Sequence, residues 1–422
     1  MANHEVSSLT GSKKPKFFYG YIVVLTAFFV MFAMAGALST YGVFFKPLAT
    51  EFGWTRAITA GAYSVSVFLA GLFFMVTGRL TDRFGPRLVV TVGGFILSLG
   101  LFLMSRINAT WQLYLFFGVI FAVGLSGGLV PMMSTVAKWF VKRRGLMTGI
   151  VLSGVGVGQV TVPLVATYFI ATYGWRTAYI YMAVIALVLI VIAAQFLRRD
   201  PGQVGQLPDG ESATKPASSV SETKGVSLGE AIHTRQFWML CVMYFSYGFF
   251  AHPTLVHIVP HATDVGISAM TAASILSVIG GLSAAGRIGM GSAGDRIGNK
   301  RGLIIVFILA LFALLWLQLA KELWMFYLFA VVFGVAYGGL IALEAPMAAQ
   351  LFGLRAHGAI LGVVHFGATI GAAISTPLAG RLFDITGSYQ GAFFIFAVLS
   401  VAGLILTSLL RPPRKEGLME ST

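Results

Sequence analysis

Charged residues are scarce in this sequence. Asp, Glu, Lys and Arg together make up 10% of its 422 residues, whereas an ordinary soluble domain contains roughly 25%. The apolar residue types account for 57% of the chain, and its mean hydropathy is +0.85. Water is therefore excluded as the main solvent of this protein, and the soluble globular classes are excluded with it.

Cysteine is almost absent, since Cys241 is the only one. A single thiol permits neither an internal disulfide nor a thiolate metal cluster. The sequence also lacks a G-x-x-x-x-G-K-[ST] loop, the pattern whose backbone amides hold nucleotide phosphates. The single cysteine excludes disulfide and thiolate-metal frameworks, and without the nucleotide-binding loop the sequence does not support chemistry driven by ATP.

Long apolar runs are what the sequence has in abundance. A hydrocarbon core about 30 Å thick is crossed by roughly 20 apolar residues in helical form, because lipid offers no partners to exposed backbone N–H and C=O groups. The sequence predicts an all-α membrane protein with twelve transmembrane helices, and it excludes an outer-membrane barrel. The predicted spans lie near 18–45, 57–78, 88–105, 111–137, 145–170, 176–197, 237–260, 271–291, 302–320, 324–350, 357–383 and 390–410.

Basic residues outnumber acidic ones by 29 to 15, which gives a formal charge of +14. In a soluble protein such a charge would suggest nucleic acid as the partner, but here the cations follow the ends of the spans. If the N-terminus lies inside the cell, 22 of the 29 Lys and Arg residues are cytoplasmic, six are external, and Arg287 falls inside a span. This asymmetry predicts that both termini are cytoplasmic and that the lipid bilayer, not nucleic acid, is the partner.

The chain is expected to have two halves joined by a linker. The longest polar stretch, 198–235, is rich in Pro, Gly and Ser, a composition that cannot bury enough apolar surface to fold alone. We expect it to be a cytoplasmic linker between two bundles of six helices, 18–197 and 236–410. Residues 1–17 and 411–422 are expected to form cytoplasmic tails.

Internal repetition supports this division. The pattern G-x-x-x-D-R-x-G occurs at Gly78–Gly85 after the second span and at Gly291–Gly298 after the eighth, 291 − 78 = 213 residues later. Many transporter folds consist of repeated halves with the substrate site at their interface. The repeat therefore predicts two pseudo-symmetric six-helix bundles.

The first copy of the repeat matches a longer pattern, G-x-L-x-D-R-x-G-x-[RK]. This pattern resembles the loop motif of the major facilitator superfamily, and the resemblance extends over the whole chain. It implies the twelve-helix fold of that superfamily and secondary transport. The matching residues are Gly78, Leu80, Asp82, Arg83, Gly85 and Arg87.

A narrower resemblance is carried by Tyr41–Pro47, Trp139–Gly145 and Arg287 in the eighth span. These residues are similar to the signatures of bacterial monocarboxylate transporters and their oxalate/formate relatives, which implies a small carboxylate as substrate. The chain departs from the animal members at two places. It opens its first span with Phe18–Tyr21 in place of D-G-G-W-G-W, and Ser283 stands where they carry an Asp four residues before the arginine.

Arg287 is the strongest candidate for substrate binding. It lies among small residues inside an apolar span, where a charge costs at least ~2.5–3.5 kcal/mol on insertion scales. Its planar guanidinium matches a carboxylate, so we predict that it anchors the substrate, with Ser283 as a neighbouring pocket residue. Two alternatives stay open: the side chain reaches the headgroups, or it pairs with Glu344 as a gate.

Three residues are candidates for proton coupling. Glu344 is the only acidic residue well inside a predicted span, although a role as a gate is the alternative. His365 lies close to where oxalate/formate exchangers carry a lysine, and an unperturbed imidazole titrates near pH 6.5; the alternative is a neutral histidine that packs between helices. Lys46 matches the lysine after the F-F pair of the monocarboxylate family, with snorkelling to the headgroups as its alternative.

The pocket is expected to have an apolar wall beside its polar anchor. In the seventh span, His252, His257 and His261 occur with two prolines, which predicts a broken helix at the outer mouth with His257 as a pocket or gate residue. The i, i+5 spacing of the first two histidines does not place them on one helical face, so no metal site is predicted. The aromatic residues expected to line the pocket are Tyr41, Tyr337 and Phe366.

The acidic and basic residues of the repeated motif are predicted to act in gating. Glycine turns place them at the cytoplasmic ends of helices, where ion pairs between the two bundles can break and form again. These residues are Asp82, Arg83, Asp295 and Arg296.

Together these features predict a secondary active transporter of small monocarboxylates of the lactate and pyruvate type, working by proton symport and alternating access. One alternative is an organic anion exchanger of the oxalate/formate type, and another is a transport-inactive membrane sensor on the same scaffold. Neither enzymatic activity nor a cofactor or metal is predicted. We expect a monomeric multi-pass protein of the bacterial inner membrane.

Overall fold

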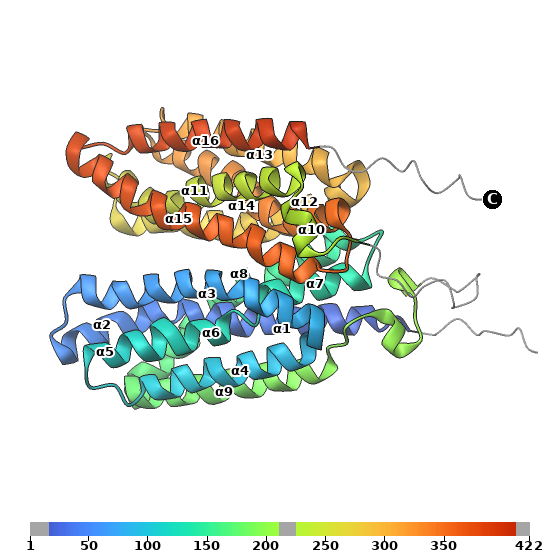
Figure 1. The fold of residues 1–422 in the computed structure, drawn as a ribbon. Helices are drawn as coiled ribbons and strands as arrows, with labels where there is room; N and C mark the ends of the chain where they lie inside the picture. Colours follow the sequence, from blue (N-terminus) through green and yellow to red (C-terminus); the bar gives the residue numbers. More distant parts are fainter. Residues whose placement is uncertain (1–16, 211–224, 411–422) are drawn as a thin grey trace, which may run out of the picture.

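The computed structural model describes residues 17–210 and 225–410 (Figure 1). Within these residues, twelve helices are long and apolar enough to cross a membrane, which confirms the predicted all-α class and the number of spans. The first span consists of α1 (Gly20–Ser39) and α2 (Tyr41–Phe52). The fourth consists of α5 (Thr110–Leu113), a π-helical stretch (Tyr114–Phe121), α6 (Ala122–Leu125) and α7 (Leu129–Trp139).

The other ten spans are single helices. In the first half of the chain they are α3 (Arg56–Phe84), α4 (Pro86–Met104), α8 (Arg144–Tyr173) and α9 (Trp175–Phe196). In the second half they are α11 (Arg235–Asp264), α12 (Ala269–Ile297), α13 (Asn299–Leu317), α14 (Leu323–Phe352), α15 (His357–Thr386) and α16 (Gln390–Leu409).

Two helices continue past the ends predicted for their spans. The second and eighth spans were expected to end near residues 78 and 291, but α3 continues to Phe84 and α12 to Ile297. The polar residues of the repeated motif end the apolar run without ending the helix. Both helices stop at the last glycine of the motif, Gly85 with φ of 84° and Gly298 with φ of 94°, backbone angles that favour glycine.

The predicted break in the seventh span is wrong, because α11 is one helix of 30 residues with Pro253 and Pro260 inside it. A proline removes one backbone donor, but membrane helices tolerate this where neighbouring groups satisfy the backbone. Pro253 cannot donate to the carbonyl four residues earlier, that of Phe249, while the hydroxyl of the adjacent Thr254 donates to the Phe250 carbonyl, 2.6 Å away. The seventh span is therefore continuous past its histidines.

The described parts of the predicted linker are folded onto the bundles. Residues 201–204 and 208–210 form short 3-10 turns, and the indole of Trp139 donates to the Arg198 carbonyl at 3.0 Å. After the gap, α10 (Leu228–Ile232) precedes α11. The part before residue 211 thus contacts the first bundle, and α10 contacts α11 and α15 of the second. Of the predicted tails, all but Phe17 lie outside the described residues.

The two halves of the chain form two bundles with the same internal packing. In Figure 1, α1 to α9 lie below and α11 to α16 above. Within the first bundle α1 packs on α8 and α4 on α9, while in the second α11 packs on α15 and α13 on α16. Each pair in one bundle thus corresponds to a pair six spans later, as the sequence repeat predicts.

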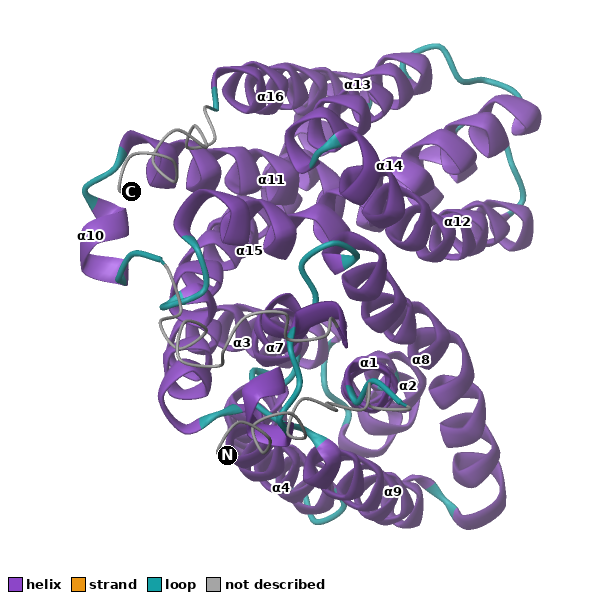
Figure 2. Cartoon of the chain, turned by 90° about the vertical axis from the view of Figure 1, so that its right-hand side faces the viewer, coloured by secondary structure: helices purple, strands orange, loops and turns teal. Residues whose placement is uncertain are grey.

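The bundles meet along two helix pairs, α3 with α15 and α8 with α12. Figure 2 looks onto the end of the molecule where α1 begins and α16 ends, which we call the termini end, and shows the two bundles there one above the other. Glycines permit the close approach. On the first pair Gly78 faces the backbone of Gly358, and on the second Gly145 faces the backbone of Gly291.

The contact between α8 and α12 loosens away from the termini end. At Gly145 an added Cβ would overlap the Gly291 carbonyl, whereas at Gly156, three turns further along α8, it would lie 3.7 Å from the Cβ of Ala284. One turn beyond Ala284 on the same face of α12, a Cβ at Gly280 would meet nothing within 4 Å. The two bundles are therefore closed at the termini end and diverge toward the opposite end.

Candidate functional site

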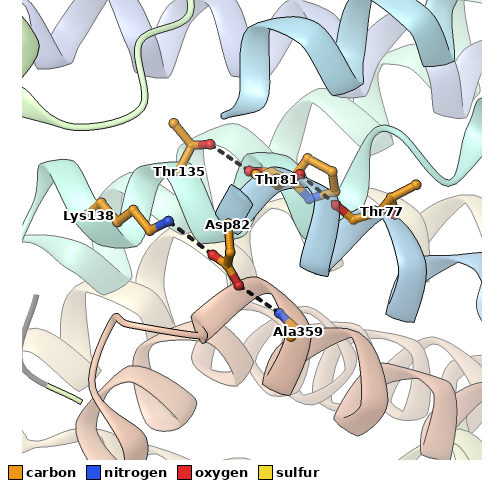
Figure 3. Close-up of polar contacts among 7 residues, drawn as sticks. Thr77, Thr81, Asp82, Thr135, Lys138 and Ala359 are labelled. Atoms are coloured by element: carbon orange, nitrogen blue, oxygen red, sulfur yellow. Dashed lines mark hydrogen bonds and ion pairs between the residues drawn. The ribbon is translucent and has the colours of Figure 1, made fainter. Parts of the chain in front are cut away.

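A carboxylate from each bundle crosses the interface at the termini end. Asp82, in the last turn of α3, accepts a hydrogen bond from the backbone N–H of Ala359 at 3.0 Å, and its other oxygen lies 3.0 Å from the ammonium of Lys138 (Figure 3). Ala359 lies in the first turn of α15, whose free N–H groups and positive dipole end attract an anion. One Asp82 side chain thus joins α7 and α15.

The second copy of the motif makes the reciprocal contact. Asp295, in the last turn of α12, accepts hydrogen bonds from the backbone N–H groups of Gly145 at 2.7 Å and Leu146 at 2.8 Å. These two residues begin α8, so that each bundle places a carboxylate on a helix N-terminus of the other. In both of its copies, the repeated motif thus places an Asp on a helix N-terminus of the opposite bundle.

The form of these contacts differs from the ion pairs expected between the bundles. The bonds that cross the interface go to backbone N–H groups, and the ion pair of Asp82 with Lys138 stays within the first bundle. The other two motif residues, Arg83 and Arg296, are exposed. A carboxylate on a helix N-terminus needs no basic side chain as its partner, because the orphan amides supply the donors.

Arg287 lies at the interface beyond these contacts, where the bundles begin to diverge. Its side chain is 3% exposed, and its Nη1 donates to the Leu152 carbonyl of α8 at 2.7 Å. Nε has no hydrogen-bond partner among the described residues. The residue is thus held at the boundary with the opposite bundle, and the observed burial does not match the alternative in which it reaches the headgroups.

No Asp or Glu of the described chain pairs with this guanidinium. The alternative of a pair with Glu344 is not what the structure shows, since Glu344 contacts a different residue. A buried charge without a counter-ion is costly. The arrangement leaves Arg287 able to accept a carboxylate from a ligand, because a guanidinium carries five donors and only one is used here.

Glu344 and His365 form a second polar centre in the same bundle. Glu344 of α14 is fully buried, and its two carboxylate oxygens lie 3.0 and 3.2 Å from the imidazole Nδ1 of His365 on α15. Phe74 of α3 covers the imidazole from the other bundle in an edge-on arrangement, with ring centroids 5.3 Å apart. The two residues predicted separately as proton carriers are therefore one unit, placed against the bundle interface.

The polar groups of this central region come from the second bundle. Tyr247 of α11 and Tyr337 of α14 have ring centroids 6.0 Å apart, and His252 lies 6.4 Å from each of them. The first bundle presents aromatic rings here: besides Phe74, Phe68 of α3 lies 6.1 Å from Phe366 of α15. The side chains named here are ionisable on the second bundle and aromatic on the first, a combination of residue types that small-molecule sites commonly have.

The remaining predicted pocket residues lie in varied surroundings. Ser283 is buried beside Gly338 of α14, and Phe366 lies at the bundle interface. Tyr41 is buried within the first bundle, where its hydroxyl donates to the Thr59 carbonyl at 2.6 Å. Lys46 is exposed on α2. The structure therefore gathers Arg287, Tyr337 and Phe366 near the interface and leaves Tyr41 and Lys46 within α2.

The histidines of α11 do not form one cluster: His252 lies beside Tyr247 and Tyr337, whereas His257 and His261 share Tyr389 as a neighbour. The Nε2 atom of His257 is 3.1 Å from the Thr376 carbonyl, and its ring is tilted by 40° to that of Tyr389, with centroids 5.1 Å apart. His261 packs against Phe326 and Tyr389. Within residues 17–210 and 225–410, no group of three His, Cys, Asp or Glu side chains is placed to hold a metal ion.

Three residues of this region were missed in the sequence. The position of Lys138 could have indicated its role: it is the one cation of its cluster that precedes Trp139, so it lies within the helix α7 rather than in the loop. Tyr247 and Leu152 carry no signal in the sequence, since a tyrosine and a leucine are ordinary in an apolar span. Only the packing shows that the Tyr247 ring and the Leu152 carbonyl adjoin the arginine site.

Comparison with known proteins agrees with this architecture. A family model described as Major Facilitator Superfamily matches residues 27–293 and 262–421. The agnestins efflux protein AgnL12 of Paecilomyces divaricatus is 27% identical over 429 residues, which cover 99% of this chain and 94% of the relative. Monocarboxylate transporter 13 of Rattus norvegicus is 26% identical over 391 residues, which cover 91% of this chain and 87% of the relative.

Among solved structures, the fucose:proton symporter FucP of Escherichia coli superposes with a TM-score of 0.69 at 15% sequence identity. The superposition covers 93% of this chain and 99% of FucP, and at this identity it bears on the fold alone. The fold and the relatives are those of multi-pass membrane transporters, which are not enzymes. The protein described here belongs to the Major Facilitator Superfamily.

Proposed function

We propose that this protein is a secondary active transporter of small monocarboxylates of the lactate and pyruvate type, working by proton symport and alternating access. The observation that carries the proposal is the buried guanidinium of Arg287 at the bundle interface, without an acidic partner in the described chain. Relatives named monocarboxylate transporters, at 26% identity, support the substrate class.

A carboxylate is the ligand that best matches this arrangement. Arg287 uses one donor on the Leu152 carbonyl, and the rest of the fork can bind two carboxylate oxygens in parallel. The apolar rings of the first bundle offer contact to a short carbon chain rather than to a second charge. A single anchored carboxylate with an apolar remainder describes a monocarboxylate.

Proton symport follows from the charge of the substrate and from Glu344 with His365. Uptake of a bare anion into a negative interior costs about 2.3 kcal/mol per 100 mV, a cost that a co-transported proton removes. The imidazole can hold this proton while the carboxylate, 3.0 Å away, stabilises the resulting charge. The pair also argues against the exchanger of the oxalate/formate type, because Glu344 neutralises the second cation that a dicarboxylate would need.

The contacts of Asp82 and Asp295 describe one state of the transport cycle. We take the termini end to be cytoplasmic, as the distribution of Lys and Arg predicts, in a bacterial inner membrane. The structure then corresponds to a state closed to the cytoplasm. Opening the inward-facing state requires that both carboxylates leave the helix N-termini of the opposite bundle.

The test is uptake of radiolabelled L-lactate into proteoliposomes, with and without an inward proton gradient. We expect gradient-stimulated uptake in the wild type and its loss in Arg287→Ala and Arg287→Lys, because the ammonium of lysine cannot form the parallel pair of bonds. Competition with pyruvate, formate and oxalate belongs in the same assay. Lactate uptake that survives unchanged in Arg287→Ala contradicts the proposed site, and oxalate or formate counterflow without lactate uptake selects the exchanger.

A further inference from the structure

A groove between α1 and α9 runs along the outside of the first bundle. It has a volume of about 390 Å³, and its rim is formed by exposed apolar side chains, Leu25 and Phe29 on α1 and Ile192 and Phe196 on α9. The helices on which α9 packs, α1, α4 and α8, all belong to the first bundle. Because both helices of the groove cross the membrane, it opens to the lipid and not to the arginine site between the bundles.

One polar side chain lies on the floor of this groove. Thr26 lines the groove and is 6% exposed, and its hydroxyl makes no hydrogen bond within residues 17–210 and 225–410. The hydroxyls of Thr77 and Thr167, by contrast, each donate to the carbonyl four residues earlier, as membrane helices commonly allow. A hydroxyl left unpaired in apolar surroundings is costly, so Thr26 is available to an acceptor from outside the chain.

The termini end of the groove carries a positive charge. The hydroxyl of Tyr19, just before α1, donates to the Phe196 carbonyl at 2.9 Å and joins the two helices where the groove ends. The guanidinium of Arg198 lies 5.9 Å from the centre of the Tyr19 ring. Its Nη1 donates to the carbonyls of Gln195 and Leu197, which leaves the donors of Nη2 and Nε for another partner. None of the ion pairs of the described chain includes Arg198.

The separation of this charge from the hydroxyl matches the depth profile of a lipid leaflet. Thr26 follows Gly20, the first residue of α1, by 26 − 20 = 6 residues, or about 9 Å along the helix. The headgroup region adds about 5–7 Å on each side of the hydrocarbon core. An arginine at the ends of the two helices therefore lies at the level of the lipid phosphates, and Thr26 lies where the glycerol esters meet the acyl chains.

We propose that this groove binds one anionic phospholipid, with its phosphate on Arg198, a glycerol ester carbonyl on Thr26 and an acyl chain between α1 and α9. A phospholipid carries an anion, an ester acceptor and an apolar chain in the order in which the groove presents their partners. A guanidinium forms charge-assisted hydrogen bonds with phosphate, whereas a zwitterionic headgroup also brings a cation close to the arginine. The inference depends on neither the substrate nor the coupling ion of the transporter.

Native mass spectrometry of the full-length protein in detergent is the test. The probes are dioleoyl phosphatidylglycerol and dioleoyl phosphatidylcholine, which share their acyl chains and esters and differ in headgroup charge. The Kd of the first bound lipid is expected to be about fivefold lower for phosphatidylglycerol in the wild type, and Arg198→Gln is expected to remove this difference. Arg199→Gln is the matched control, because it removes the same charge where the side chain lies beside Gly85, between α3 and α4. The difference is expected to persist in this variant.

Two further variants test the groove itself. Thr26→Val removes only the hydroxyl and is expected to raise the Kd of both lipids about threefold, because both carry ester carbonyls. Its control is Thr167→Val, since that hydroxyl already has a partner in the chain, and the Kd values are expected to stay at those of the wild type. Ala193→Leu, which fills part of the groove, is expected to weaken both lipids at least threefold.

Equal affinity of the wild type for the two lipids overturns the inference, and so does an equal loss of the difference in Arg198→Gln and Arg199→Gln. Wild-type Kd values in both Thr26→Val and Ala193→Leu show that the lipid binds elsewhere. These two substitutions leave the hydrogen bonds of Arg198 in place, so they test the site even if Arg198→Gln unfolds the protein. Because L-lactate uptake is a separate measurement, each of these results leaves the proposed function intact.

Discussion

The Nδ1 atom of His365 lies 3.0 Å from one carboxylate oxygen of Glu344 and 3.2 Å from the other. The two residues belong to neighbouring helices, α15 and α14, and the carboxylate is fully buried. An imidazole and a carboxylate at this distance form one hydrogen-bonded unit. A change in either residue is therefore expected to alter how the other holds a proton.

Glu344→Gln is expected to separate substrate movement from proton coupling. The amide can still bond to His365 but cannot stabilise a charged imidazole, so the inward proton gradient is expected to lose its effect on L-lactate uptake. Lactate counterflow, which needs no net proton movement, is expected to continue. Both are measured in proteoliposomes. The control is Glu230→Gln, an exposed glutamate outside the spans, and a normal gradient effect in Glu344→Gln contradicts the assignment.

Asp82→Asn is expected to weaken the closed contact at the termini end. The variant keeps an oxygen acceptor for the Ala359 N–H but loses the negative charge that the N-terminus of α15 attracts. The loss is worth about 1 kcal/mol, which changes the equilibrium between the closed and open states about fivefold. The readout is labelling of a cysteine at Ala359, which is 4% exposed, in a Cys241→Ser background. Faster labelling by about fivefold is expected.

Asp295→Asn is expected to have a similar effect on the reciprocal contact at the start of α8. The matched control for both variants is Asp384→Asn, which removes a carboxylate from the exposed far end of α15. Its labelling rate is expected to equal that of the starting protein. If all three variants label alike, the carboxylates do not hold the bundles closed.

Gly145→Ala is expected to force the bundles apart at the termini end. An added Cβ would overlap the backbone carbonyl of Gly291, and backbone on both sides leaves no flexible side chain to move away. Transport is expected to slow because the closed state is disfavoured. The control is Gly289→Ala on α12, where a Cβ would meet nothing within 4 Å. Equal uptake rates for the two variants would contradict the packing argument.

Asp209→Ala is expected to destabilise the protein by about 1–2 kcal/mol. One Asp209 oxygen accepts from the backbone N–H of Val141 at 3.0 Å and of Lys142 at 2.8 Å, and its φ of 57° is unfavourable for alanine. Asp209→Asn keeps an acceptor and tolerates this backbone conformation, so its loss is expected to be smaller. Thermal unfolding in detergent compares them, and equal losses would show that the two bonds contribute little.

The twelve spans could be predicted from the sequence because lipid leaves the backbone few alternatives to the helix. The apolar runs marked where helices cross, but they did not mark every end: α3 and α12 continue through the polar motif to Gly85 and Gly298. Hydropathy indicates whether a segment lies in lipid or in water, and a helix can continue from the lipid into the water. The same limitation applies to α11, where two prolines suggested a break that the packed helix does not have.

Several of the candidate site residues could also be predicted from the sequence. A charge inside an apolar span identified Arg287 and Glu344, and the repeat identified Asp82 and Asp295. What only the tertiary structure decided was their partners: Asp82 and Ala359 are 277 residues apart, and Glu344 and His365 are 21 apart on separate helices. Composition and periodicity determine that a segment is a membrane helix, but a contact between helices depends on how their faces are rotated and packed, which no local pattern encodes.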